Sequence, residues 1–180
     1  QKIILGIDPG TVILGYGLIN ITGKNASLIE MGVLRLHKYP DHFIRLGKIY
    51  EKINQLIIGF SPNEVAIEAP FFGKNVQSML KLGRAQGVAL APAFNRGIPV
   101  FEYAPRKIKQ SITGNGNASK EQVARMVQGI LKFNESPEYL DATDAVAAAL
   151  CHFYQAGNPV SIAGSQSWAE FIRKNPDRIH

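Results

Sequence analysis

The chain has 180 residues, of which 46% are hydrophobic, and its 20 basic and 14 acidic residues give it a formal net charge of +6. This length and composition suit one globular domain with an ordinary hydrophobic core. No apolar stretch approaches the roughly 20 residues that span a bilayer and no leader precedes Ile3, which excludes a membrane protein and leads us to expect a cytoplasmic one.

The first part of the chain is predicted to form strands and then helices in alternation. Residues 2–8, 14–20 and 27–36 have strand patterns separated by short turns, which indicates an antiparallel meander. Helical spacing follows from residue 41 to 58 and ends at Ser61-Pro62. A short strand over 64–69 precedes a helix over 76–95, and a further strand covers 98–103. One side of the 76–95 helix carries Met79, Leu80, Gly83, Gly87, Leu90 and Phe94. Its glycines permit close backbone approach, either in the core or in a subunit contact, and we expect core packing.

The remainder is predicted to be helical. A helix begins after Pro105, and a loop covers 114–119. Ser119 and Gln122 have the spacing of a capping box, so a second helix starts there. A last helix spans about 140–156, with Val146, Ala149, Leu150 and Phe153 on one side. The pattern predicts an α/β domain over 1–156, in which helices flank a five-stranded mixed sheet, and a partly disordered C-terminal arm over 157–180.

The positive charge is concentrated in one region. Residues 73–125 contain nine basic residues and two acidic ones, so this segment alone carries +7 while the whole chain carries +6. A local field of this sign favours a polyanionic partner, and nucleic acid is the first candidate. A solvated basic surface would have the same composition, so the charge needs support from the acidic residues.

Four carboxylates are placed so that they could converge. Asp8 and Glu68 each end an apolar strand immediately before a turn that contains proline. Asp141 and Asp144 are three positions apart and therefore share a face of the last helix. If the two strands are neighbours and the helix packs against their ends, all four acids meet. A divalent cation would relieve their repulsion, and oxygen ligands suit Mg²⁺ or Mn²⁺.

Taken one at a time, these acids could have purely structural roles. Acidic residues in the first turn of a helix interact favourably with the helix dipole, so the pair Asp141 and Asp144 is weak evidence by itself. A salt bridge to a core Arg or Lys could account for Asp8 or Glu68 separately. Neither role accounts easily for all four residues.

Several motifs together resemble the bacterial Holliday-junction resolvases of the RuvC type. They are ILGIDPGT followed by GYG, AIEAPFFGKN, LKLGRAQGVA, VFEYAPRKIKQSITGNGNASKEQV and DATDAVAAAL, which occur in this order between about Ile3 and Tyr154. The resemblance implies a ribonuclease H-like fold and a homodimer that nicks four-way DNA junctions symmetrically with two Mg²⁺ ions per subunit, for which Mn²⁺ can substitute. It also implies 5′ phosphate and 3′ hydroxyl products and a branch-migration complex of the RuvA and RuvB type as partner. By motif, the catalytic and metal-binding acids are Asp8, Glu68, Asp141 and Asp144, with Asp8 shared between the ions.

The same resemblance suggests DNA contacts. Phe71 occupies the place of an aromatic residue that wedges into the junction, although Phe72 is adjacent and either ring could close the core instead. Lys109 and Lys120 match basic DNA-binding positions. The other expected DNA contacts, which could equally be ordinary solvated residues, are Lys74, Asn75, Arg84, Arg106 and Lys107.

Three rival functions fit parts of the sequence. The segment GIDPGT is similar to the first phosphate-binding turn of actin-like sugar kinases and chaperone ATPases, but those proteins need two such domains and 180 residues are too few. A ribonuclease H-like nuclease acting on RNA is the second, and PFFGKN and the long basic match argue against it. A non-catalytic junction-binding protein is the third. It would gain nothing from four acids facing phosphate groups.

Overall fold

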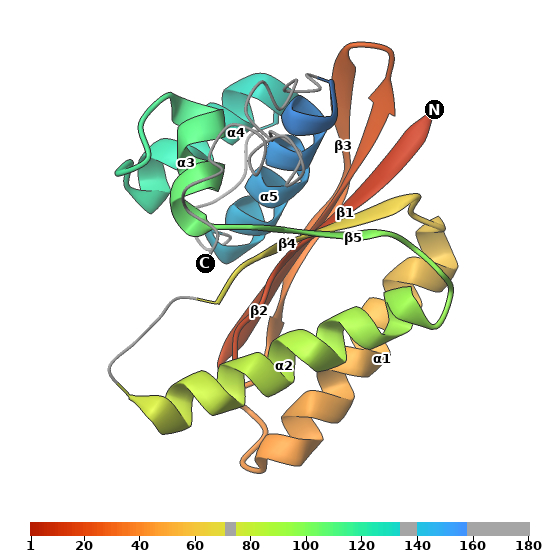
Figure 1. Ribbon diagram of the computed structural model, residues 1–180, viewed down its shortest axis with the longest axis vertical. Coiled ribbons are helices and arrows are strands. Elements are labelled where there is room, and N and C mark those ends of the chain that lie inside the picture. The colour runs from red at the N-terminus through yellow and green to blue at the C-terminus, as the bar shows by residue number, and fades with distance from the viewer. Residues whose placement is uncertain (71–74, 134–139, 158–180) are drawn as a thin grey trace, which may run out of the picture.

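The computed structural model describes residues 1–70, 75–133 and 140–157. A five-stranded sheet has the order β3-β2-β1-β4-β5 (Figure 1). Its strands are β1 (Lys2–Asp8), β2 (Ile13–Thr22), β3 (Asn25–Arg35), β4 (Glu64–Glu68) and β5 (Val100–Tyr103). The first three strands form the expected antiparallel meander, and β4 and β5 continue the sheet in parallel with β1. The predicted mixed five-stranded sheet is confirmed.

Helices cover both faces of this sheet (Figure 1). One face is covered by α1 (His42–Phe60) and α2 (Val76–Phe94), and the other by α3 (Pro105–Thr113), α4 (Lys120–Leu131) and α5 (Leu140–Gly157). Alternate residues of β1 point into the two cores, with Ile4 on the α5 side and Leu5 on the α1 side. None of the helices among the described residues is long and apolar enough to cross a membrane.

Helix α5 lies directly on the backbone of the two central antiparallel strands. A Cβ atom on Gly6 would lie 1.9 Å from the Ala145 carbonyl oxygen, and one on Gly15 would lie 2.0 Å from the Asp141 carbonyl oxygen. Gly6 is also paired with Gly17 across the two strands. The glycines therefore let the helix approach the sheet more closely than side chains would permit.

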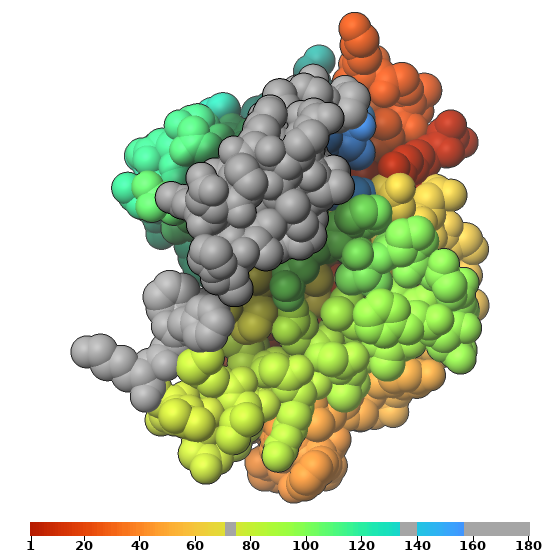
Figure 2. Space-filling model, in the orientation of Figure 1, coloured from red at the N-terminus to blue at the C-terminus, as the bar shows by residue number. Residues whose placement is uncertain are grey.

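The prediction for the buried side of α2 was wrong. The helix buries Ala85, Ala89 and Ala93, whereas Leu80 is 52% exposed and Phe94 is 62% exposed. Gly83 and Gly87 have no heavy atom within 4 Å of an added Cβ among the described residues. Small side chains face α1 and the sheet because they allow close packing, and the larger apolar residues form part of the molecular surface, where α2 is prominent (Figure 2).

The one-sided pattern predicted for α5 is also too narrow. Residues 145–151 are all fully buried, because the sheet covers one side of this helix and α3 and α4 cover the other. In α4 the predicted capping box of Ser119 and Gln122 is confirmed. Met126, which shares the helical spacing of the buried Val123 and Val127, is 46% exposed. Residues 158–180, which make up nearly all of the predicted arm, lie outside the described residues.

Candidate active site

Two parallel neighbouring strands deliver carboxylates to one edge of the sheet. The register pairs Ile7 of β1 with Ile67 of β4, so the next residues, Asp8 and Glu68, end the two strands side by side. Apolar residues precede both acids and fix them in the core, which leaves only the strand ends partly accessible. The adjacency expected from the sequence is therefore present.

The N-terminal part of α5 brings two further acids, Asp141 and Asp144, to this edge. Carboxylate oxygens of Asp8, Asp141 and Asp144 all lie within 4.8 Å of one another. Glu68 lines the same hollow of about 220 Å³ with Asp8 and Asp144. The close contact between Gly15 and the Asp141 carbonyl sets how near the helix can bring its acids to β1.

Lys120, the first residue of α4, lies against the acids of α5. Its Nζ is 3.0 Å from Oδ1 of Asp141 and 2.8 Å from Oδ2 of Asp144. A salt bridge to a basic residue was the structural alternative for Asp8 and Glu68. In the structure it is Asp141 and Asp144 that form one, with a lysine of the basic region as partner. Lys120 pairs with the two acids of α5, and no ion pair among the described residues reaches Asp8 or Glu68.

Burial, together with repulsion between the acids, changes their protonation. Burial, with the nearby charges of Glu68 and Asp144, raises the pKa of Asp8 from 3.8 to about 8. Burial and the charge of Asp144 raise the pKa of Glu68 to about 7. Burial also raises the pKa of Asp144, although Lys120 opposes the change. Burial disfavours the charged form of Lys120, yet Asp144 and Asp141 raise its pKa above the ordinary value.

The donor set fits a hard divalent cation. The residues around the hollow supply carboxylate oxygens and two ammonium groups, with neither His nor Cys among those that line it. Mg²⁺ and Mn²⁺ prefer such oxygen ligands, and a cation here would relieve the repulsion that raises the pKa values of Asp8 and Glu68. Asp8 and Asp144 belong both to the group of three close carboxylates and to the lining of the hollow that Glu68 shares.

The predicted DNA contacts divide into several groups. Lys109 of α3 and Lys120 line the hollow, and Lys109 also faces the charges of Glu68 and Asp144. Phe71, Phe72 and Lys74 lie outside the described residues. The remaining four are exposed but do not line the hollow: Asn75 caps α2 through its bond to the Ser78 amide, Arg84 lies on the outer side of α2, Arg106 packs over Gly116, and Lys107 lies on α3.

The glycines that place α5 were not identified from the sequence. Gly15 and Gly17 lie two residues apart on β2 and so point to the same face of the sheet, and Gly6 of β1 lies opposite Gly17. A repeated glycine spacing of two within apolar strands indicates a close backbone approach, and this signal was available in the printed sequence. The apolar residues Pro105, Ile108 and Val123, which also line the hollow, carry no comparable signal.

The raised pKa values make a prediction about stability without metal. A carboxyl group with a raised folded-state pKa stabilises the fold below its unfolded pKa, and this stabilisation is lost as the pH rises through the folded value. For Asp8 the window runs from about 4 to about 8. In EDTA at pH 8.5 we therefore expect Asp8→Asn to unfold roughly 4 to 8 °C above the parent chain, equivalent to about 2 kcal/mol.

Thermal unfolding followed by circular dichroism measures this difference. At pH 4 the two proteins should unfold within about 1 °C of each other, since the pH is then close to the pKa of the unfolded carboxyl group and nearly all of the electrostatic cost is absent. A constant difference at all pH values would contradict the electrostatic origin.

Comparisons with known proteins give a consistent result. The family model described as "Crossover junction endodeoxyribonuclease RuvC" matches residues 4–152. A protein of that name from Cytophaga hutchinsonii is 59% identical over 99% of this chain and 88% of its own length, and one from Bacteroides fragilis is 56% identical over 99% of this chain and 96% of its own length. The solved structure "T. thermophilus RuvC in complex with Holliday junction substrate" superposes with a TM-score of 0.79 at 36% identity, covering 87% of this chain and 95% of that one.

Proposed function

Because the chain belongs to the crossover junction endodeoxyribonuclease RuvC family, we propose that it resolves Holliday junctions with the acid cluster at the ends of β1, β4 and α5. The chain is a nuclease with a ribonuclease H-like fold that hydrolyses DNA phosphodiester bonds. The main observation behind this assignment is that carboxylates of Asp8, Asp141 and Asp144 lie close together. Asp8 and Asp144 also line a hollow with Glu68, Lys109 and Lys120. Family membership implies dependence on a divalent metal.

The side chains of the site suit phosphodiester hydrolysis. Asp8, Glu68, Asp141 and Asp144 would hold two Mg²⁺ ions, with Asp8 shared between them. Bound there, the ions supply activation of a water molecule and stabilisation of the departing oxygen. Lys109 and Lys120 attract the DNA phosphate and orient it over the carboxylates. Water adds its oxygen to phosphorus, the bond from phosphorus to the 3′ oxygen breaks, and a proton passes to that oxygen. The products are a 5′ phosphate and a 3′ hydroxyl.

Residues outside the hollow are proposed to make further contacts with the DNA. We propose that Phe71 or Phe72 stacks on bases that are opened at the junction, next to Glu68 in the chain. The other proposed DNA contacts, which reach phosphate groups on the arms, are Lys74, Asn75, Arg84, Arg106 and Lys107. Arg84 lines a shallow pocket on α2 with Leu80 and Gly83 and lies apart from the hollow, so it would reach DNA only from the margin of that part of α2.

Substrate competition tests this function. We expect paired symmetric nicks in a synthetic mobile four-way junction with Mg²⁺, and no cutting with EDTA. A linear duplex and an RNA–DNA hybrid of the same sequence should remain intact under these conditions. Preferred cutting of the hybrid would favour the ribonuclease alternative, and tight binding of the junction without cutting in Mg²⁺ or Mn²⁺ would favour the non-catalytic one.

The outer side of α2 supports a homodimer, which symmetric cutting of two strands requires. Val76, Leu80 and Phe94 are large, apolar and more than half exposed, and Gly83 and Gly87 allow another backbone to come close. Apolar residues around glycines on one helix suit a self-complementary contact between two copies. We also propose that the dimer works in the cytoplasm with a branch-migration complex of the RuvA and RuvB type.

Disruption of this surface gives a further prediction. Leu80→Glu should convert the dimer into a monomer, because a dimer with twofold symmetry would bury two carboxylates in one apolar contact. Sedimentation equilibrium measures the change, which we expect to be at least about 100-fold in the dissociation constant. Gln77→Glu, on the same helix and also exposed, adds the same charge as a control. An unchanged mass for Leu80→Glu would exclude this side of α2 as the interface.

A further inference from the structure

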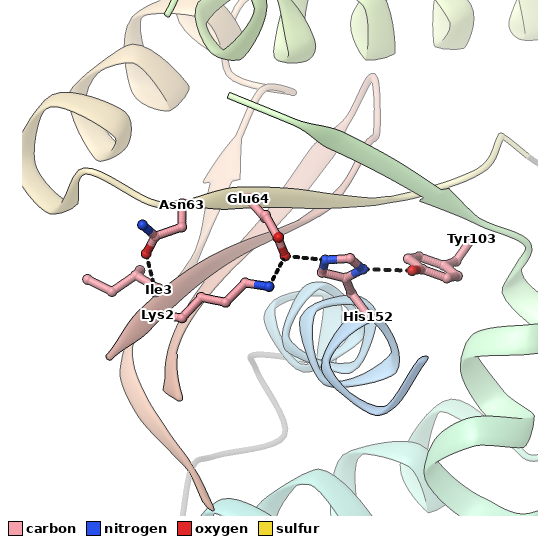
Figure 3. A network of polar contacts seen from close by, with 6 residues as sticks. All are labelled: Lys2, Ile3, Asn63, Glu64, Tyr103 and His152. Atoms are coloured by element: carbon pink, nitrogen blue, oxygen red, sulfur yellow. Dashed lines mark hydrogen bonds and ion pairs between the residues drawn. The ribbon is translucent and has the colours of Figure 1, made fainter. Parts of the chain in front are cut away.

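A buried histidine on α5 binds the two strands at the edge of the sheet. His152 is 3% exposed and lies eight residues after Asp144, or about 12 Å further along the helix. Its Nε2 is 2.5 Å from Oε2 of Glu64 on β4, and its Nδ1 is 2.7 Å from the hydroxyl oxygen of Tyr103 on β5 (Figure 3). The ring of Phe101, also on β5, stacks on the imidazole with 4.2 Å between centroids.

The surrounding charges set the direction of these hydrogen bonds. Burial would raise the pKa of Glu64, but hydrogen bonds from Lys2 and His152 outweigh it and lower the pKa, so Glu64 is a carboxylate. A carboxylate only accepts hydrogen bonds, and Nε2–H of His152 therefore donates to it. In the neutral ring Nδ1 is then an acceptor for the Tyr103 hydroxyl. Both ring nitrogens are satisfied, and removing either partner leaves a buried polar atom unpaired.

These bonds join the elements that carry the acids. Asp141 and Asp144 are on α5, and Glu68 ends β4. Tyr103 is paired with Glu68 in the register of β4 and β5, and its carbonyl accepts a 2.9 Å bond from the Ala69 amide. The hydroxyl of the same tyrosine binds α5 through His152. Tyr103 thus contacts α5 through its hydroxyl group, and Ala69, the residue after Glu68, through its carbonyl group.

Polar contacts complement the apolar packing on this side of α5. On β1 and β2 the glycines bring helix and backbone together, and on β4 the residue of this face between Glu64 and Glu68 is Ala66, which is fully buried in the same core. Apolar contacts have no preferred direction, whereas the hydrogen bonds of His152 to Glu64 and Tyr103 favour one position of α5 along β4 and β5.

We propose that His152 is a positioning residue of the nuclease site, which fixes α5 against β4 and β5 and so sets the distance between Glu68 and the pair Asp141 and Asp144. This inference rests on the proposed function. Its consequence is that small changes at His152 or Tyr103 alter the geometry of the carboxylates without touching the hollow. Displacements of about 1 Å at a reacting centre lower rates by up to about 100-fold.

Two variants and one matched control test this role. Tyr103→Phe removes only the hydroxyl group, and His152→Leu removes both hydrogen bonds. Asn63→Ala is the control, because the Asn63 side chain accepts a 2.7 Å bond from the Ile3 amide at the same end of β4 but does not contact α5 (Figure 3). All four proteins are compared at a temperature at which circular dichroism shows each of them folded.

Cleavage kinetics on the four-way junction and Mn²⁺ titration by calorimetry are the readouts. We expect kcat to fall roughly tenfold for Tyr103→Phe and more for His152→Leu, with KM for the junction within about twofold and Mn²⁺ binding weakened several-fold. Asn63→Ala should keep kcat and Mn²⁺ affinity even if it is equally destabilised. Losses that follow stability in all three variants, or parent-like Mn²⁺ affinity and kcat in His152→Leu, would overturn the proposal. If the parent chain cuts no junction the proposed function fails, and the Mn²⁺ titration still decides the role of His152.

Discussion

Asp8→Asn is expected to abolish junction cleavage, with kcat reduced by at least about 1,000-fold. Asp8 is the most deeply placed strand acid of the cluster, with its pKa raised to about 8, and a carboxylate oxygen of it lies within 4.8 Å of those of Asp141 and Asp144. An amide of nearly the same shape keeps the packing at the end of β1 but removes the charge that would hold a cation on either side. Single-turnover cleavage at saturating enzyme measures the chemical step directly.

Binding should survive the same substitution. The basic residues that would meet the phosphates are untouched, and the substitution adds no negative charge beside the DNA, whether Asp8 is protonated in EDTA or ionised beside Ca²⁺. We therefore expect the dissociation constant for the junction in Ca²⁺ or EDTA to be equal to or lower than that of the parent chain. Lys24→Gln, in the turn between β2 and β3, serves as a surface control. Cleavage by Asp8→Asn within about tenfold of the parent rate would show that the chemistry lies elsewhere.

Gly15→Ala is expected to have the second-largest effect, although the added group is one methyl. Its Cβ would lie 2.0 Å from the carbonyl oxygen of Asp141, so strand or helix must move by roughly 1 Å. The moving helix carries Asp141 and Asp144. We expect a rate loss of roughly 100-fold and a loss of about 1 to 3 kcal/mol in unfolding free energy.

A glycine with free space around it provides a control for the general effect of replacing glycine by alanine. Gly47 of α1 has no heavy atom within 4 Å of an added Cβ among the described residues. Gly47→Ala should raise the stability by about 0.5 to 1 kcal/mol and leave cleavage unchanged. Urea unfolding and cleavage rates measured on both variants give the contrast. Normal cleavage by Gly15→Ala would mean that the placement of α5 on the strands is not critical.

Much of the fold could be predicted because its patterns are local. The strands and helices were found close to their observed limits, since alternation, helical spacing and capping signals act within a few residues. The side of α2 that faces inward could not be found in this way. Leu80 and Phe94 look like core residues in a single chain, and only the three-dimensional packing shows that Ala85 and Ala89 are buried instead.

The site was partly predictable for a different reason. Acids at the ends of apolar strands are rare enough to be conspicuous, and parallel neighbours align their ends, so Asp8 and Glu68 followed from pattern and topology. The roles of Gly15 and His152 depend on which elements pack together. A single histidine in an apolar helix forms no repeating pattern from which its contacts could be predicted. Its partners Glu64 and Tyr103 are 88 and 49 residues away in the chain.

The acids are far apart in the sequence, so the ribosome adds them to the growing chain at different times. Asp8 and Glu68 are made early, but Asp141 and Asp144 lie in α5, the last described element. A chain still lacking α5 has two of the four carboxylates and leaves the glycines of β1 and β2 uncovered. With the proposed site, the capacity to cut DNA would therefore arise only when α5 docks on the sheet. An incomplete translation product or a C-terminally degraded fragment that lacks α5 would then be unable to nick the chromosome.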